Sequence, residues 1–162
     1  MFQVSSKDVI DGGTAAPLLV YDKGGCNGRD CSPQLSWQGA PKGTQSFAIT
    51  LHDPDAPRNG GWWHWLVFDI PATVNSLPTA TGSADGKALP PQAIQLLNDY
   101  GERGYGGPCP PKGHGAHHYV LTVHALRVPT LEAGPDDAPA AVERAILREE
   151  LGKAVLTFRY GR

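Results

Sequence analysis

The chain has 162 residues, a formal net charge of −2 and 19% charged residues. This length allows one domain with a buried core, which we expect to span residues 1–162. The charge balance leaves no broad basic face for nucleic acid and no polybasic run for an anionic membrane surface, and no apolar run approaches the roughly 18 residues that cross a bilayer.

In chain order, the sequence predicts mostly strands. The 20 glycines and 15 prolines favour a turn-rich fold over a helical bundle. Apolar or alternating runs bounded by Gly, Pro or Asp are typical of strands. Six such runs are present: Leu18–Tyr21, Pro33–Trp37, Ser46–Leu51, Trp65–Ile70, Tyr119–Leu126 and Ala154–Tyr160.

One helix is predicted late in the chain, at Pro135–Glu150. Asp136 and Asp137 favour its N-terminus, and apolar residues follow at helical spacing. Ala93–Leu97 is too confined by neighbouring prolines to be more than a loop, and Ala72–Gly86 is predicted to be a mobile surface loop. The pattern predicts a mainly β fold: an antiparallel β-sandwich of two sheets, with a helix near the C-terminus and peripheral short helices.

The three cysteines concern the cellular compartment. Cys26 and Cys31 have a C-x4-C spacing that allows a disulfide, whereas Cys109 stands alone in a Gly/Pro loop. The odd count and the lack of a basic-then-apolar leader favour reduced thiols and a cytoplasmic location. We interpret Cys109 as a small buried side chain rather than a nucleophile.

Two segments carry most of the chemical information. The first runs from His52 to Pro57 and on through Trp63–Trp65, and the second runs from Gly106 to Pro111 and on through His117–Tyr119. Each joins a stiff Pro/Gly turn to an apolar strand, which is a good mount for a small polar pocket. We therefore expect the two segments to form a single ligand site.

The side chains in these segments suit a small oxyanion. Residues two apart in a strand share a face, so His117 and Tyr119 are predicted to point the same way and His118 the opposite way. Imidazole and phenol groups both donate hydrogen bonds to anionic oxygens. Asp53 is expected to accept the other ring N–H of a histidine and thereby fix its tautomer.

Two further expectations follow from the same patterns. Strand alternation puts His64 on the same face as Leu66 and Phe68. Gly106 and Gly107 are expected to let backbone N–H groups approach the ligand, as in anion-binding nests.

Taken singly, most of these residues are better explained as structural. We interpret His52, His114 and His124 as surface or core residues, and the four tryptophans as core or rim packing. No second Cys/His pair completes a zinc site with Cys26 and Cys31, and no cofactor motif is present.

The motifs together resemble the phosphatidylethanolamine-binding protein family, in its bacterial and archaeal branch of Raf-kinase-inhibitor-like proteins. The matching stretches cover most of the chain in the order of that family. They are Cys26-Asn27-Gly28, Ser32-Pro33-Gln34-Leu35-Ser36-Trp37, Asp53-Pro54-Asp55-Ala56-Pro57, His64-Trp65-Leu66-Val67, Asn98-Asp99-Tyr100-Gly101, Gly104-Tyr105-Gly106-Gly107-Pro108-Cys109-Pro110-Pro111 and His117-His118-Tyr119.

The resemblance implies a sandwich with a small cavity for phosphate, acetate or phosphorylated head groups. Carried over by motif, the cavity is lined by Asp53, Asp55, Ala56, Pro57, His64, Gly107, Pro108, His117 and Tyr119. It also implies a cis peptide bond before Pro57, which the Ala-Pro context favours, and a homodimer.

Three function classes stay open. The first is a non-enzymatic binding protein for a small anion or a phosphorylated head group, without membrane insertion, and we favour it. The second is an inhibitor or regulator of a kinase or protease. The third is a weak metal-assisted hydrolase using Asp53, His64 and His117, against which stands the lack of a nucleophile elbow, a His-Glu-x-x-His motif or a Walker loop.

Overall fold

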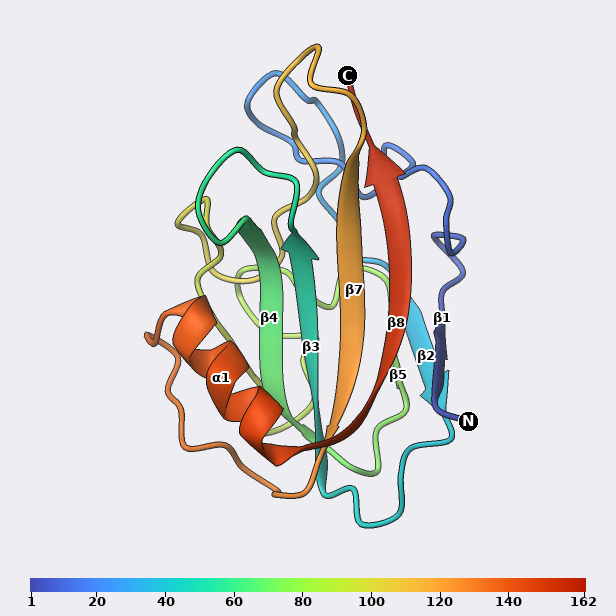
Figure 1. Cartoon of the computed structure of the whole chain (residues 1–162), viewed down its shortest axis with the longest axis vertical. Coiled ribbons are helices and arrows are strands. Elements are labelled where there is room, and N and C mark those ends of the chain that lie inside the picture. Colours follow the sequence, from blue (N-terminus) through green and yellow to red (C-terminus); the bar gives the residue numbers. More distant parts are fainter.

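The computed structural model describes residues 1–162 and is a sandwich of two antiparallel sheets, as expected (Figure 1). The small sheet has the order β1-β2-β5, and the large sheet has the order β6-β4-β3-β7-β8. The strands are β1 (Gln3–Ser5), β2 (Leu35–Gln38), β3 (Ser46–Asp53), β4 (Trp62–Pro71), β5 (Ser76–Leu77), β6 (Ile94–Gln95), β7 (His117–Leu126) and β8 (Glu150–Tyr160).

The large sheet is buried on both faces over much of its length. Its inner face packs against the small sheet through a cluster of 19 buried residues that includes Trp65 and Tyr119. Helix α1 (Pro139–Glu149) covers the lower part of the outer face, as Figure 1 shows, through a second cluster that includes Leu66 and Phe68. Burial on both faces explains why β3, β4 and β7 read as nearly continuous apolar runs.

One predicted strand is absent. Leu18–Tyr21 forms turns, in which the N–H of Leu19 bonds the carbonyl of Ala16 and the N–H of Val20 bonds the carbonyl of Pro17. Its residues are nonetheless largely buried. The run is apolar because Leu19 belongs to the main core cluster and Leu18 packs against it. Periodicity alone does not separate a buried turn from a short strand.

The helix is shorter than predicted. It begins at Pro139 and has no acidic residue in its first turn. A proline is tolerated in the first turn of a helix but not in its interior, so Pro139 prevents a start at Pro135. Asp137 instead accepts the backbone N–H of Gly134 in the preceding turn.

Other local predictions also need correction. Ile94–Gln95, inside the predicted loop, forms the edge strand β6. The segment 72–86 contains β5 and the fully buried Thr81, so it is anchored rather than free. The peripheral short helices are wrong, since α1 is the one helix of the chain. That helix is neither long nor apolar enough to cross a membrane.

The disulfide pairing differs from both expectations. Cys26 bonds Cys109, 83 residues away, and Cys31 is the free cysteine. The fold lays the loop at 106–111 along the segment after Leu19, where the N–H of Tyr21 bonds the carbonyl of Pro108. A pairing set by such long-range contact cannot be obtained from cysteine spacing.

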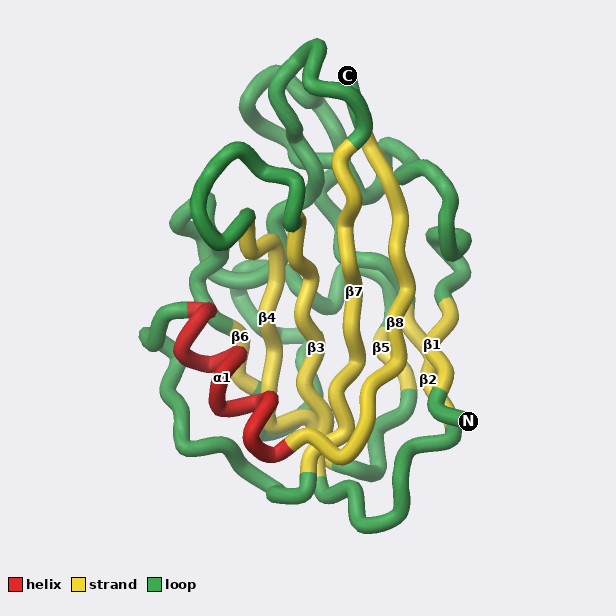
Figure 2. Tube along the Cα trace, in the orientation of Figure 1, coloured by secondary structure: helices red, strands yellow, loops and turns green.

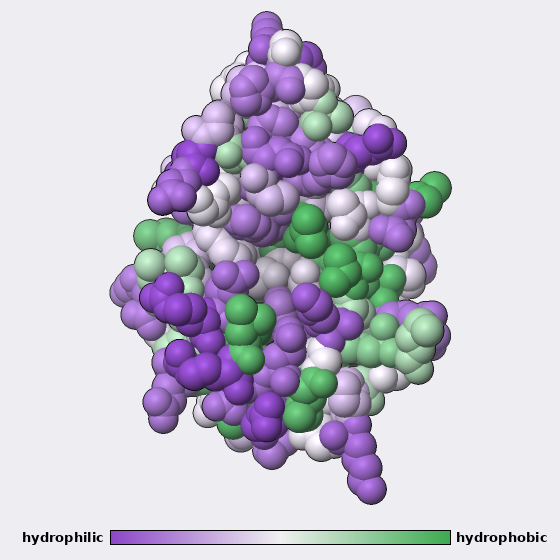
Figure 3. Space-filling view, viewed as in Figure 1, coloured by the Kyte–Doolittle hydropathy of each residue, from purple (hydrophilic) through white to green (hydrophobic).

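Long loops gather at one end of the sandwich, at the top of Figure 2. The segments 54–61, 106–116 and 22–31 meet there, where β3 ends and β4 and β7 begin. On the face drawn in Figure 3, this end is mostly hydrophilic. Loops that are supported by a rigid sheet are where binding groups are usually placed.

Candidate functional site

A pocket of about 250 Å³ opens among these loops. It draws on β3, β4 and β7 and on the turns that follow or precede them. The lining residues are Asp53, Ala56, Pro57, Arg58, Trp62, His64, Tyr100, Cys109, Pro110, Pro111, His117 and Tyr119. The two segments singled out in the sequence therefore do meet at one hollow.

Asp53 and His117 form the buried polar core of the pocket. Both side chains are about 4% exposed, and the Nδ1–H of His117 donates to Oδ2 of Asp53 over 2.7 Å. The other carboxylate oxygen, Oδ1, accepts the backbone N–H of Asp55. Asp53 thus fixes the orientation of the His117 ring, which is the role that the sequence predicted for it.

The imidazole of His114 contacts the outer side of the His117 ring. Nδ1 of His114, in the exposed loop before β7, lies 2.9 Å from Nε2 of His117. With Nδ1–H of His117 engaged by Asp53, Nε2 of a neutral His117 accepts from His114. Both nitrogens of the His117 ring therefore have partners inside the protein.

His64 enters the pocket because of an irregularity in β4. The pairing of β3 with β4 shifts register between Leu51 and His52, so that His52 opposes Trp63 and Leu51 opposes Trp65. His64 lies in this bulge, and its ring packs 5.2 Å from that of Tyr119. The prediction that it shares a face with Leu66 was wrong, because a bulge re-aims a side chain that simple alternation would place on the opposite face.

The charge state of His64 follows from its surroundings. The ring is 2% exposed, and burial lowers its pKa from 6.5 to about 4, while the nearby carbonyl of Gly106 and the carboxylate of Asp53 oppose the shift. The ring is therefore neutral at pH 7. Its Nδ1 lies 2.6 Å from the carbonyl oxygen of Gly106.

Three donors complete the polar lining, from Tyr119, Arg58 and Trp62. Burial, reinforced by the charge of Asp53, raises the pKa of Tyr119, so its hydroxyl keeps its proton in the usual pH range. Arg58 is half-exposed at the mouth and lies over the Trp62 ring, with its guanidinium carbon 4.9 Å from the ring centroid. The indole N–H of Trp62 has no hydrogen-bond partner.

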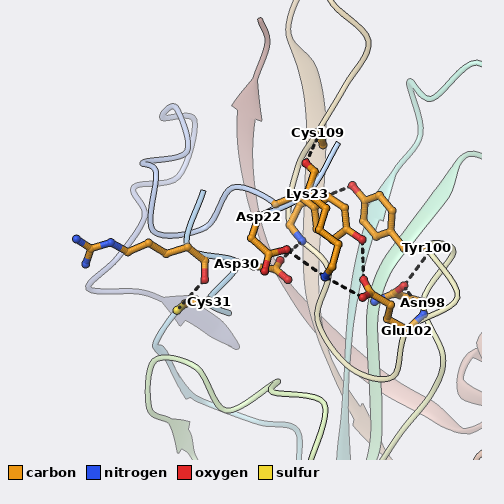
Figure 4. A network of polar contacts seen from close by, with 11 residues as sticks. Asp22, Lys23, Asp30, Cys31, Asn98, Tyr100, Glu102 and Cys109 are labelled. Carbon is orange, nitrogen blue, oxygen red and sulfur yellow. Dashed lines mark hydrogen bonds and ion pairs between the residues drawn. The ribbon is translucent and has the colours of Figure 1, made fainter. Parts of the chain in front are cut away.

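The wall opposite β7 is built around Tyr100, which Figure 4 shows beside Glu102 and Cys109. The Tyr100 hydroxyl donates to the carbonyl of Gly107 over 2.7 Å, and its ring stacks on Tyr21 with the centroids 3.8 Å apart. Tyr21 in turn donates to Glu102. Side-chain bonds between residues far apart in the sequence therefore help to hold the wall.

Asp30 holds the same wall from behind. Its Oδ1 accepts the backbone N–H of Gly107 over 2.7 Å (Figure 4). Burial raises the pKa of Asp30 to about 6, although the bond from Gly107 opposes the rise.

Three of the nine residues expected at the pocket are elsewhere. Asp55 is exposed and accepts from both the backbone N–H and the ring of His118, which lowers the pKa of that carboxyl. Gly107 and Pro108 lie behind the lining. The expected amide nest is also wrong, because the N–H of Gly106 bonds the carbonyl of His64 and that of Gly107 bonds Asp30.

The peptide bond before Pro57 is trans, since the chain contains no cis peptide bond. Trans is the intrinsically preferred state of a bond before proline, by about 0.5–1 kcal/mol. The cis expectation taken from the resemblance is therefore wrong for this chain.

The lining includes six residues that the sequence did not single out as site residues. They are Arg58, Trp62, Tyr100, Cys109, Pro110 and Pro111. Five of them adjoin or lie within the two chemical segments, so extending each segment to its neighbours finds them. Tyr100 lies outside both segments, and its only sequence signal is its place in the Asn98–Gly101 stretch of the family resemblance.

Asp53, His64 and His117 do not form a metal centre. No group of three or more His, Cys, Asp or Glu side chains is arranged to hold an ion. Nδ1 of His117 and Oδ2 of Asp53 are hydrogen-bonded to each other, so these two atoms do not converge on an ion as free ligands.

Comparison with known proteins gives a consistent result. A family model described as phosphatidylethanolamine-binding protein matches residues 5–161. The UPF0098 protein YbcL of Escherichia coli is 43% identical over 156 residues, covering 96% of this chain and 85% of that protein. YbhB of the same organism is 38% identical over 152 residues, covering 94% of this chain and 95% of that protein.

Comparison with solved structures points to the same family. The crystal structure of E. coli YbcL, described as a new member of the mammalian PEBP family, superposes with a TM-score of 0.97 at 42% identity, covering 99% of this chain and 98% of that chain. A homologue from Chlamydia trachomatis has a TM-score of 0.81 at 27% identity, covering 99% of this chain and 97% of that chain.

Proposed function

The chain belongs to the phosphatidylethanolamine-binding protein family, and on that premise we propose that it is a non-enzymatic binding protein for phosphate or a phosphorylated head group. The observation that supports this most directly is the pocket at the junction of β3, β4 and β7. Its polar lining combines the buried Asp53–His117 pair with His64 and Tyr119. The volume, about 250 Å³, suits a small group rather than a lipid with its acyl chains.

The proposed ligand contacts follow from the free donors. Tyr119 offers a hydroxyl that stays protonated, and Arg58 offers a guanidinium at the mouth, which suits phosphate oxygens. Pro57, Pro110 and Pro111 stiffen the rim and reduce the ordering cost on binding. His117 can contact the ligand through Nε2 when His114 moves aside.

The test is thermal stabilisation by inorganic phosphate. Ligand at ten times its Kd stabilises the native state by about 1.4 kcal/mol, which raises the Tm of a chain this size by roughly 3–6 °C. Tyr119→Phe removes a hydroxyl inside the pocket and is expected to weaken the shift. Tyr160→Phe, on β8 and outside the lining, is the matched control and is expected to leave it intact. Equal shifts in both variants would place the anion elsewhere.

Location and assembly stay predictions. The Cys26–Cys109 disulfide counts against the cytoplasmic location that we expected, because disulfides persist in oxidising compartments. Counting the reactive thiols of protein taken from the native host tests whether the disulfide forms there, and one reactive thiol is expected if it does. The expected homodimer is tested by light scattering, and a kinase or protease partner is tested by inhibition of a purified candidate.

A further inference from the structure

The two pocket imidazoles have their protons in defined places. Nδ1 of His64 lies 2.6 Å from the carbonyl oxygen of Gly106, and Nδ1 of His117 lies 2.7 Å from Oδ2 of Asp53. A carbonyl oxygen only accepts, and an ionised carboxylate only accepts. Each Nδ1 must therefore carry the hydrogen.

This leaves Nε2 of each ring for other partners. Nε2 of His117 is already bonded to His114. Nε2 of His64 has no partner in the protein, and it is the ring nitrogen left to face the pocket that His64 lines. Because the buried ring is neutral, this nitrogen carries a lone pair. It accepts hydrogen bonds and cannot donate one to an anion.

We propose that the pocket selects for a ligand that carries its own proton: a phosphoryl group with a P–OH, which donates to Nε2 of His64. Free phosphate and phosphate monoesters have this hydroxyl. Sulfate and the phosphodiester of a lipid head group do not. The inference rests on the proposed anion-binding function and specifies the chemical class of the ligand.

The remaining lining is consistent with this choice. Asp53 adds a buried negative charge to the pocket wall, and a bare anionic oxygen placed beside it is repelled. A hydroxyl presented to this side of the pocket avoids both that repulsion and the lone pair of His64. The other phosphate oxygens are then directed to Tyr119 and Arg58.

The size of the expected selectivity follows from the cost of an unpaired acceptor. An aprotic anion leaves a buried acceptor unpaired and sets oxygen lone pairs against it, which corresponds to about a ten- to hundredfold loss of affinity. The expected preference for phosphate over sulfate is of that order.

The test uses two ligand pairs matched in charge and measured by calorimetry on the native protein. At pH 8, phosphate is mostly a dianion with one hydroxyl, and sulfate is a dianion of similar size with none. At pH 5, methyl phosphate is a monoanion with one hydroxyl, because its second pKa is about 6, and dimethyl phosphate is a monoanion with none. The second pair separates a monoester from a lipid-like diester.

Two variants test whether the preference for phosphate over sulfate arises at His64. His64→Phe keeps a ring and removes the acceptor, so the phosphate-to-sulfate ratio of affinities is expected to fall to within about twofold of one. Tyr119→Phe removes a donor that serves both ligands, so both affinities fall while the ratio is retained. If His64→Phe does not fold, His64→Leu replaces it, since leucine also lacks an acceptor, and the two ligand pairs on the unaltered protein still decide the question.

The outcomes separate the two claims. Phosphate and sulfate binding with equal affinity, or dimethyl phosphate binding more tightly than methyl phosphate, would overturn this inference and leave anion binding in place. A ratio unchanged in a folded His64 variant would also overturn it. Binding of none of the four anions would overturn the proposed function, and the inference with it.

Discussion

Asp53 and His117 lie 64 residues apart in the sequence and are joined by a 2.7 Å hydrogen bond between two buried side chains. The bond ties the end of β3 to the start of β7 and fixes a ring of the pocket. It connects the stability of the fold to the geometry of the site, and both effects are measurable.

Asp53→Asn is expected to destabilise the protein by about 1–3 kcal/mol, because it removes the charge from a buried, charge-assisted bond and offers an amide N–H in place of an acceptor. Asp55→Asn is the matched control, since Asp55 also accepts from a histidine but is exposed. Its expected cost is about 0–1 kcal/mol. Urea unfolding measures both, and equal costs would contradict the structural role assigned to Asp53.

His114→Ala is expected to strengthen phosphate binding about three- to tenfold, which is the effect of removing one competing hydrogen bond from Nε2 of His117. His118→Ala is the control, because His118 lies in the same region and bonds Asp55 instead. Titration calorimetry near pH 6 compares the three proteins. Weaker binding by the His114 variant would mean that His114 is a ligand contact and not a competitor.

Replacing the Cys26–Cys109 disulfide by two alanines is expected to reduce the free energy of unfolding by about 2–4 kcal/mol, since the bond closes a long loop in the unfolded chain. It also releases the pocket wall that carries Cys109. Cys31→Ala removes a thiol without removing a crosslink, and its effect is expected to stay within about 0.5 kcal/mol. Guanidinium unfolding of the oxidised proteins makes the comparison.

Asp30 is expected to make the protein less stable as the pH rises from about 4 to about 6. Its pKa is raised from 3.8 to about 6 in the folded state. Between these values the folded chain binds more protons than the unfolded chain, so the free energy of unfolding falls with pH, and the loss is complete above the folded pKa.

Asp30→Asn isolates this contribution. Asparagine tolerates the positive φ of this position and still accepts the N–H of Gly107. The difference in Tm between the variant and the parent protein is expected to grow in favour of the variant from pH 4 to pH 6. A difference independent of pH would mean that the Asp30 pKa is not raised. The comparison also removes the opposite trend of His64, which is common to both proteins.

The sequence predicted the large sheet well. Ser46–Leu51, Trp65–Ile70 and Tyr119–Leu126 all lie inside observed strands, because apolar runs of this length bounded by Pro or Gly reflect burial on both faces. It failed at short edge strands such as β5 and β6, which are held by a partner strand and not by their own pattern.

Local pattern alone determined which residues supply the chemistry: a carboxylate at the end of one strand and a histidine two residues before a tyrosine at the start of another. Only the tertiary structure decided how they are used. The bulge in β4 turned His64 toward Tyr119, and the packing of distant loops joined Cys26 to Cys109. Register shifts and contacts between distant segments depend on the balance of the whole core, and nearest neighbours in the sequence do not encode that balance.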